Sequence, residues 1–154
     1  MGGVRAPDVA PQNQTPSFPP LGAVILLDTH AWLWLCLEPR RLSATAAGGI
    51  RRALHDGGLA VASITLWEVA MMVARGRVIP QGTAEAWISA LIDRSGVGIK
   101  GITPAVAVLA AHFPDDFPGD PADRLIAATA RAEGVSLVTR DARIRASALV
   151  ETIW

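Results

Sequence analysis

Residues 23–37 read AVILLDTHAWLWLCL, and this stretch indicates the fold most strongly. Residues 23–27 are an unbroken apolar run, which is typical of a strand buried on both faces of a parallel sheet. Residues 29–37 follow directly and predict a short helix. Asp28 stands at the junction, where the carboxyl end of a parallel strand opens into the crevice in which such sheets bind ligands. Asp28 is therefore the first candidate for a functional residue.

Strands and helices alternate along the rest of the chain. Apolar runs bounded by turn residues predict strands at 59–62, 97–102 and 135–139, with an edge strand in the tail 149–154. Helical spacing and capping residues predict helices at 44–55 after Ser43, 63–76 with Ser63 as cap, 83–93, 104–111, 120–133 and 141–148. This alternation predicts the α/β class, with a mostly parallel central sheet flanked by helices on both faces.

The length of 154 residues suits a single domain, which we place at residues 23–154. Residues 1–22 are rich in Pro, Gly, Gln and Ser, and we interpret them as a disordered tail or as translation from an upstream start codon. No window reaches the roughly 20 apolar residues of a membrane helix, and no secretory signal is recognisable. The single cysteine, Cys36, excludes an intramolecular disulfide. We expect a cytoplasmic protein.

The formal net charge is zero, which argues weakly against a nucleic-acid partner. The basic residues are nevertheless almost all arginine, with Lys100 as the one lysine, and arginine favours bidentate phosphate contacts. If four of the acids are committed to a metal site, basic side chains outnumber the acids that remain. The charge balance is therefore compatible with a nucleic-acid partner.

Four acidic residues are expected at one edge of the sheet, at strand ends or in the adjoining helices. They are Asp28, Glu68, Asp123 and Asp141. Four convergent carboxylates cannot all ionise without cations, and Mg²⁺ or Mn²⁺ is the kind of ion that oxygen ligands prefer. Such ions activate water and stabilise in-line displacement at phosphate. The pattern predicts metal-dependent phosphodiester hydrolysis.

Each acid also has a purely structural interpretation. Asp28 and Asp141 are well placed to cap the helices that follow them, and for Asp120 capping is the favoured interpretation. Glu68 shares a helix face with apolar side chains and needs a cation or an arginine, for which Arg75 is a candidate two turns further on. The sequence leaves the two interpretations of Glu68 evenly balanced.

Four segments occur in the order and spacing found in VapC-type toxins of the PIN domain family. They are LLDTHAWLWL, SITLWEVAMMVARGRV, DPADRLIAATA and LVTRD, and the resemblance covers residues 23–154. No one of these motifs is very specific, but four in order are strongly indicative. The resemblance implies a PIN-like fold, endoribonuclease activity, a homodimer, and a VapB-like antitoxin that blocks the site.

The resemblance also implies roles for individual residues. Asp28, Glu68 and Asp123 match the three family acids, and Asp141 matches the fourth. Asp120 matches the first Asp of a DPFDR pattern in which this chain has Ala122 in place of Phe. Thr29 and Thr139 match positions that help to order water or metal.

Other functional classes fit less well. A catalytically silent PIN-like binding module shares the fold, but all four acids are present. A haloacid-dehalogenase-type phosphatase requires a second Asp two residues after Asp28, where His30 stands. A receiver domain requires a lysine after a late strand, which this chain lacks. His30 and His112 are interpreted as structural.

The tryptophans and methionines are interpreted as packing residues. Trp32, Trp34, Trp67 and Trp87 lie in apolar helical patterns, which favours a place in the core or in a dimer interface. Met71 and Met72 add to an apolar surface larger than one core-facing stripe requires. Surplus apolar area of this kind usually marks an interface.

Overall fold

The computed structural model describes residues 23–154, so the expectation for residues 1–22 lies outside the described part. Five parallel strands form one sheet in the order β3-β2-β1-β4-β5. Their bounds are β1 (Ile25–Leu27), β2 (Leu59–Ala62), β3 (Gly98–Lys100), β4 (Leu137–Val138) and β5 (Thr152–Ile153). In the centre, Leu26 of β1 is in register with Ala60 on one side and Leu137 on the other. All three residues of β1 are fully buried, as the apolar run predicted.

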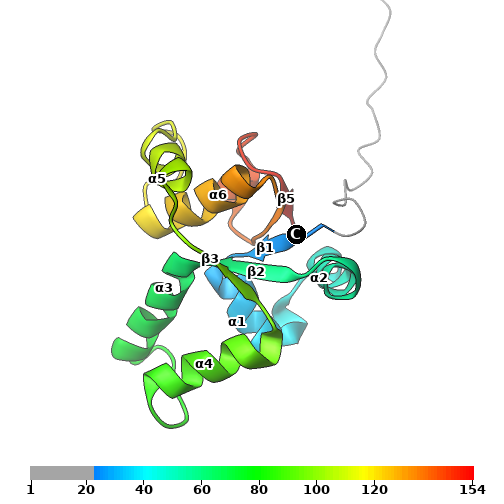
Figure 1. Ribbon diagram of the computed structural model, residues 1–154, viewed down its shortest axis with the longest axis vertical. Coiled ribbons are helices and arrows are strands. Elements are labelled where there is room, and N and C mark those ends of the chain that lie inside the picture. The colour runs from blue at the N-terminus through cyan, green and yellow to red at the C-terminus, as the bar shows by residue number, and fades with distance from the viewer. Residues whose placement is uncertain (1–22) are drawn as a thin grey trace, which may run out of the picture.

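Helices cover both faces of the sheet (Figure 1). On one face lie α1 (Thr29–Leu37), α2 (Ala44–Asp56) and α4 (Ala84–Ser95), and on the other lie α5 (Pro104–Ala111) and α6 (Pro121–Glu133). The remaining helical elements are η1 (Pro39–Arg41), α3 (Ser63–Ala74) and α7 (Ala142–Arg145). The predicted α/β architecture is confirmed.

The pleat of β1 divides the interior into two cores. Ile25 and Leu27 pack with Trp32 and the helices on the first face, whereas Leu26 packs with Ile126 of α6 on the second. Alternate side chains of a strand point to opposite faces, which explains why an unbroken apolar run is needed here. β1 is thus packed on both faces, which positions the residue at its carboxyl end.

Several predicted boundaries are wrong, including the end of the helix expected at 63–76, which lies at Ala74, and the strands expected at 135–139 and 149–154, which are limited to β4 and β5. Three of the differences have a clear physical reason. Ser63 is already the first residue of α3, and the N-cap is Ala62 without a side-chain hydrogen bond, because β2 runs directly into this helix. The strand expected at 97–102 is limited to β3, an edge strand. The helix expected at 141–148 ends at Arg145, because the Ser147 hydroxyl accepts the Leu149 N–H and the chain turns toward β5.

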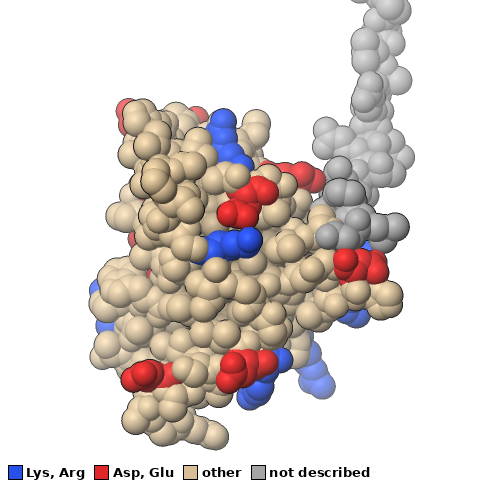
Figure 2. Space-filling view, viewed as in Figure 1, with Lys and Arg blue, Asp and Glu red and all other residues tan. Residues whose placement is uncertain are grey.

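The surface matches the charge balance of the sequence. Figure 2 shows acidic and basic side chains scattered over a largely uncharged face, without a continuous basic patch. Among residues 23–154, no helix combines the length and the apolar character needed to cross a membrane.

Candidate active site

An open pocket of about 510 Å³ lies beyond the carboxyl ends of the central strands. Its lining brings together all four predicted acids and Asp120, from the end of β1, α3, the start of α6 and the segment after β4. The lining residues are Asp28, His30, Trp34, Glu68, Asp120, Asp123, Arg140 and Asp141. Parallel topology explains this convergence, because the strands all end at one edge of the sheet.

Asp28 both caps α1 and faces this pocket. Its Oδ1 accepts the Ala31 N–H at 2.6 Å. A carboxylate has about four lone-pair sites, so capping leaves acceptor capacity toward the pocket. Burial raises the pKa of Asp28 above its ordinary value, and hydrogen bonds from Thr139 and Ala31 oppose this rise. The structural and functional interpretations of Asp28 are therefore compatible.

Thr139 connects Asp28 with Asp141. Its buried hydroxyl is hydrogen-bonded to Asp28 and accepts the Asp141 N–H at 3.1 Å. Asp141 in turn caps α7, accepting the N–H groups of Arg143 at 2.8 Å and Ile144 at 3.0 Å. One short segment after β4 thus fixes two of the acids relative to each other.

Glu68 is oriented from α1. The Thr29 hydroxyl donates a hydrogen bond to Glu68 Oε2, and the hydroxyl oxygens of Thr29 and Thr65 lie 3.1 Å apart. Burial raises the pKa of Glu68, the Thr29 hydrogen bond lowers it, and repulsion from Asp120 raises it further. The ion pair with Arg75 that the sequence allowed does not form among residues 23–154.

Asp120 and Asp123 open α6. Asp120 Oδ1 accepts the N–H groups of Ala122 at 2.8 Å and Asp123 at 3.2 Å, so the predicted cap is confirmed. The pKa of Asp123 is raised to about 6, chiefly by burial and then by repulsion from Asp120, Glu68 and Asp141. The pKa of Asp123 is thus raised by electrostatic repulsion from each of the other four acids of the pocket.

Comparison with known proteins identifies the fold family. The sequence profile of the PIN domain matches residues 25–148. The chain belongs to the PIN domain family. Ribonuclease VapC22 of Mycobacterium tuberculosis is 43% identical over 121 residues, which cover 79% of this chain and 89% of that protein. The resemblance to VapC-type toxins predicted from four sequence segments is confirmed.

Solved structures support the same fold for this PIN domain. VapBC2 from Rickettsia felis, bound to a promoter DNA fragment, matches with a TM-score of 0.65 at 15% identity, covering 84% of this chain and 96% of that chain. DNA-bound VapBC from Salmonella typhimurium matches with a TM-score of 0.62 at 14% identity, covering 84% and 96%. At such identities the likeness concerns the fold alone.

The acidic pocket of this PIN domain has the donor chemistry for a hard divalent cation. Five carboxylates line it, and burial and mutual repulsion raise the pKa of Asp28, Glu68 and Asp123. Among residues 23–154, no three acidic, His or Cys side chains are already drawn together tightly enough to hold a metal ion. The roles of these acids as ligands stay a prediction.

Sequence reasoning leaves alternatives open for some residues and misses others. Trp67 is 56% exposed and so is not a core residue, whereas Trp32 and Trp34 are buried. Thr65 escapes notice because a buried threonine on an apolar helix resembles a core position, although it lies one turn before Glu68. His112 lies away from the pocket, with its ring hydrogen-bonded to the Val108 carbonyl at 2.8 Å.

Proposed function

We propose that this PIN domain is the toxin of a toxin–antitoxin pair and cleaves RNA as an endoribonuclease that depends on Mg²⁺ or Mn²⁺. The observation that carries the proposal is the pocket lined by five carboxylates, none of which forms an ion pair within residues 23–154. The relative with 43% identity is named a ribonuclease, and the two solved structures with the same fold are VapBC complexes.

The donor set suits a hard cation. Mg²⁺ and Mn²⁺ prefer carboxylate oxygens, and a buried group of acids has an unfavourable charge unless a cation compensates it. Asp28, Glu68, Asp123 and Asp141 are the residues that would hold it. Once bound, the ion supplies an activated water and neutralises charge that develops at the phosphate.

The surrounding residues position these acids. Thr29 holds Glu68 in place, and Thr139 ties Asp28 to Asp141. Asp120 caps α6, which keeps Asp123 at the mouth of the pocket. Such supporting hydrogen bonds orient ligands and tune their affinity for a metal.

The acid pocket also suggests how a partner protein would inhibit the enzyme. Without metal it is strongly anionic, so an antitoxin segment carrying an arginine can enter and replace the charge of the cation. The planar fork of arginine binds carboxylates bidentately. We propose a VapB-like antitoxin, a homodimer as the assembly, and the cytoplasm as the location.

Cleavage by the purified protein tests the enzymatic part of this proposal. We expect it to cut RNA with Mg²⁺ or Mn²⁺ and to lose activity in excess EDTA, with recovery when metal is restored. Full activity in EDTA would contradict the metal requirement. If no cleavage is seen under any condition, the alternative of a catalytically silent PIN-like binding module would be favoured.

A second arm tests the toxin role. The product of the gene immediately upstream is co-purified, and nuclease activity is measured with and without it. We expect a stable complex and inhibition. Activity indifferent to that product would remove the toxin–antitoxin role while leaving the ribonuclease intact.

A further inference from the structure

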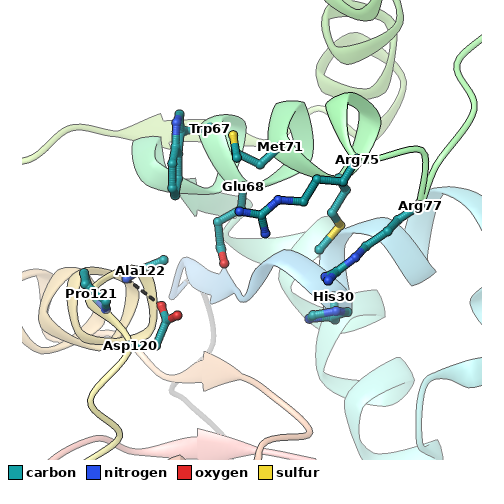
Figure 3. Close-up of a pocket in the computed structure, with 10 residues that line it drawn as sticks. His30, Trp67, Glu68, Met71, Arg75, Arg77, Asp120, Pro121 and Ala122 are labelled. Atoms are coloured by element: carbon teal, nitrogen blue, oxygen red, sulfur yellow. Dashed lines mark hydrogen bonds between the residues drawn. The ribbon is translucent and has the colours of Figure 1, made fainter.

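A second pocket adjoins the acid pocket. It has a volume of about 330 Å³ and shares His30, Glu68 and Asp120 with the acid pocket, so the two lie side by side, and together we call them the cleft. Its other walls come from α3, the turn after α3 and the start of α6 (Figure 3). We call the part lined by Trp67, Met71, Met72, Arg75 and Arg77 the side groove.

One wall of the side groove is a row of side chains along α3. Trp67, Met71 and Arg75 follow one another at intervals of four residues, which places them on one helix face. In Figure 3 the Arg75 side chain extends back along this wall toward Glu68. Trp67 has 56% of its surface exposed, so its ring is available to a ligand.

The turn after α3 brings a second arginine into the side groove. Gly76 adopts a left-handed conformation with φ 69°, which strongly favours glycine. The Arg77 N–H then donates to the Met72 carbonyl at 2.9 Å, which fixes the backbone as it leaves the helix. The Arg77 side chain points toward His30 (Figure 3).

The arginines of the side groove differ from Arg124 and Arg41, which are engaged within the fold. Arg124 donates to several backbone carbonyls, and Arg41 pairs with Glu38 and covers the Trp34 ring. Within residues 23–154, the side chains of Arg75 and Arg77 make no hydrogen bond or ion pair. Their donors are therefore available to an anion.

Trp67 is also distinguished from the tryptophan of the acid pocket. The Trp34 ring is covered by the guanidinium groups of Arg41 at 4.6 Å and Arg140 at 5.9 Å, and Trp154 packs beside it. Trp34 is therefore closed to a base, whereas Trp67 is open. An exposed aromatic face beside free arginines is the combination that binds single-stranded nucleic acid.

We infer that the side groove holds the single-stranded RNA segment next to the cleaved phosphodiester, with one base stacked on Trp67 and phosphates bound by Arg75 and Arg77. This inference rests on the proposed ribonuclease function and assigns its substrate path. The shared wall of the two pockets supports this path, because a strand with a phosphate among the acids leaves the acid pocket over one of its neighbouring surfaces. Charge favours the side groove, since the acids repel phosphate whereas Arg75 and Arg77 attract it and, unlike Arg41 and Arg140, do not lie over an aromatic ring in the described part of the chain.

Binding can be separated from cleavage by working in an Asp28→Asn background. The probe is a short fluorescein-labelled single-stranded RNA of mixed sequence, and its affinity is measured over a range of salt concentrations. We expect Trp67→Ala to weaken binding by about 5- to 100-fold and Trp67→Phe by much less, because Phe retains a stacking face. Arg75→Gln with Arg77→Gln should lower the magnitude of the slope of log affinity against log salt by about 0.7 for each phosphate that is no longer neutralised.

A matched control removes the same charge elsewhere. Arg51 and Arg131 are exposed and lie on α2 and near the end of α6, outside the cleft. Arg51→Gln with Arg131→Gln should leave the salt slope and the affinity close to those of the Asp28→Asn parent. An equal drop in this control would overturn the inference, since general charge would then explain the effect.

Three further outcomes would overturn the assignment. Unchanged RNA affinity of the side-groove variants, alongside cleavage by the wild type, would refute the path but leave the ribonuclease standing. Failure of these variants to bind the upstream gene product, with RNA affinity intact, would make the side groove the seat of a protein partner. A change of solution mass in Trp67→Ala would place Trp67 in a self-association interface.

Discussion

At the scale of single residues, the acids of the pocket differ in their expected contribution: for some the negative charge is needed for activity, and for others only the ability to cap a helix. Asn caps helices about as well as Asp, so Asp28→Asn, Asp123→Asn and Asp120→Asn should all fold. Asp28→Asn and Asp123→Asn remove charge proposed to hold a metal. We expect kcat/KM to fall by about 100-fold or more, since the ion contributes several kcal/mol to the transition state.

Asp120→Asn is the matched control for these variants. Its carboxylate oxygen accepts two backbone N–H groups, and an amide oxygen can do the same. We expect its kcat/KM to fall by less than about tenfold. Wild-type turnover in Asp28→Asn or Asp123→Asn would show that the residue in question is not a ligand.

The raised pKa of Asp123 predicts how the stability of the metal-free protein depends on pH. The value is about 6 in the folded protein against an ordinary 3.8, so the fold binds this proton more tightly than the unfolded chain does. The resulting stabilisation is present in full below about pH 3.8 and is lost as pH rises through about 6. The pKa values of Asp28 and Glu68 are also raised, so these two acids contribute to stability in the same direction.

Thermal denaturation in EDTA measures this effect. We expect the Tm of Asp123→Asn to rise relative to the wild type as pH increases through about 6, because only the wild type then acquires the repelled charge. Added Mn²⁺ should raise the Tm of the wild type most at neutral pH, since the ion binds only the folded state. A Tm difference between variant and wild type that is independent of pH would contradict the electrostatic account.

At the scale of elements, the loop between α5 and α6 is held by one side chain. Arg124 of α6 donates to the carbonyls of Pro118 at 2.9 Å, Phe113 at 3.0 Å and Pro114 at 3.2 Å. These bonds fix the loop that ends at Asp120. No sequence pattern indicates this role, because it depends on the shape of a loop without regular structure.

Arg124→Met tests the loop interaction. It keeps most of the aliphatic stem but leaves several carbonyls without their donor, and we expect a decrease of about 1–3 kcal/mol in the free energy of unfolding. Arg131→Met, in the last turn of the same helix, removes an exposed arginine and is the control. Urea denaturation measures the free energy of unfolding of both variants. Equal decreases in the two would mean that the hydrogen bonds from Arg124 to the loop contribute nothing specific to stability.

The elements also show what sequence can predict. β1 and α6 are predicted well because a doubly buried strand and a helix beginning Asp-Pro are determined by neighbouring residues. β3 and α7 are predicted too long because an edge position and a turn at Ser147 decide where they end. Local patterns therefore determine the elements better than their ends.

For the site, the strand-end rule is sufficient to place Asp28 and Asp141 in one pocket. The sequence predicts a packing role for Trp67 because α3 is apolar on nearly all sides, and only the tertiary arrangement decides which side remains open. Thr65 escapes notice for the same reason. Residues whose role depends on a neighbouring element are the ones that sequence cannot identify.

At the scale of the whole molecule, the exposed apolar surface bears on assembly. Ile79, Ile102 and Val108 are 87%, 51% and 59% exposed. Trp32 and Trp34, for which the sequence allowed a place in an interface, belong to the interior instead. Surplus apolar surface usually marks an interface, and two-fold dimers are the commonest homo-oligomers.

We therefore predict a dimer of the isolated protein at micromolar concentration. Light scattering coupled to size-exclusion chromatography measures the solution mass, both alone and with the product of the upstream gene. A monomer in both samples would leave the fold and the acid pocket unaffected, but it would contradict the proposed assembly.

The central claim is that the five-acid pocket hydrolyses RNA with a water activated by metal, and the chemistry of the new RNA ends tests it most directly. The measurement is sequencing of RNA 5′ ends from cells after induction of the wild type or of Asp28→Asn. Attack by water predicts new ends that carry a 5′-phosphate, opposite a 3′-hydroxyl, in the wild type alone. New ends with a 5′-hydroxyl and a cyclic phosphate, or the same ends with Asp28→Asn, would contradict the account.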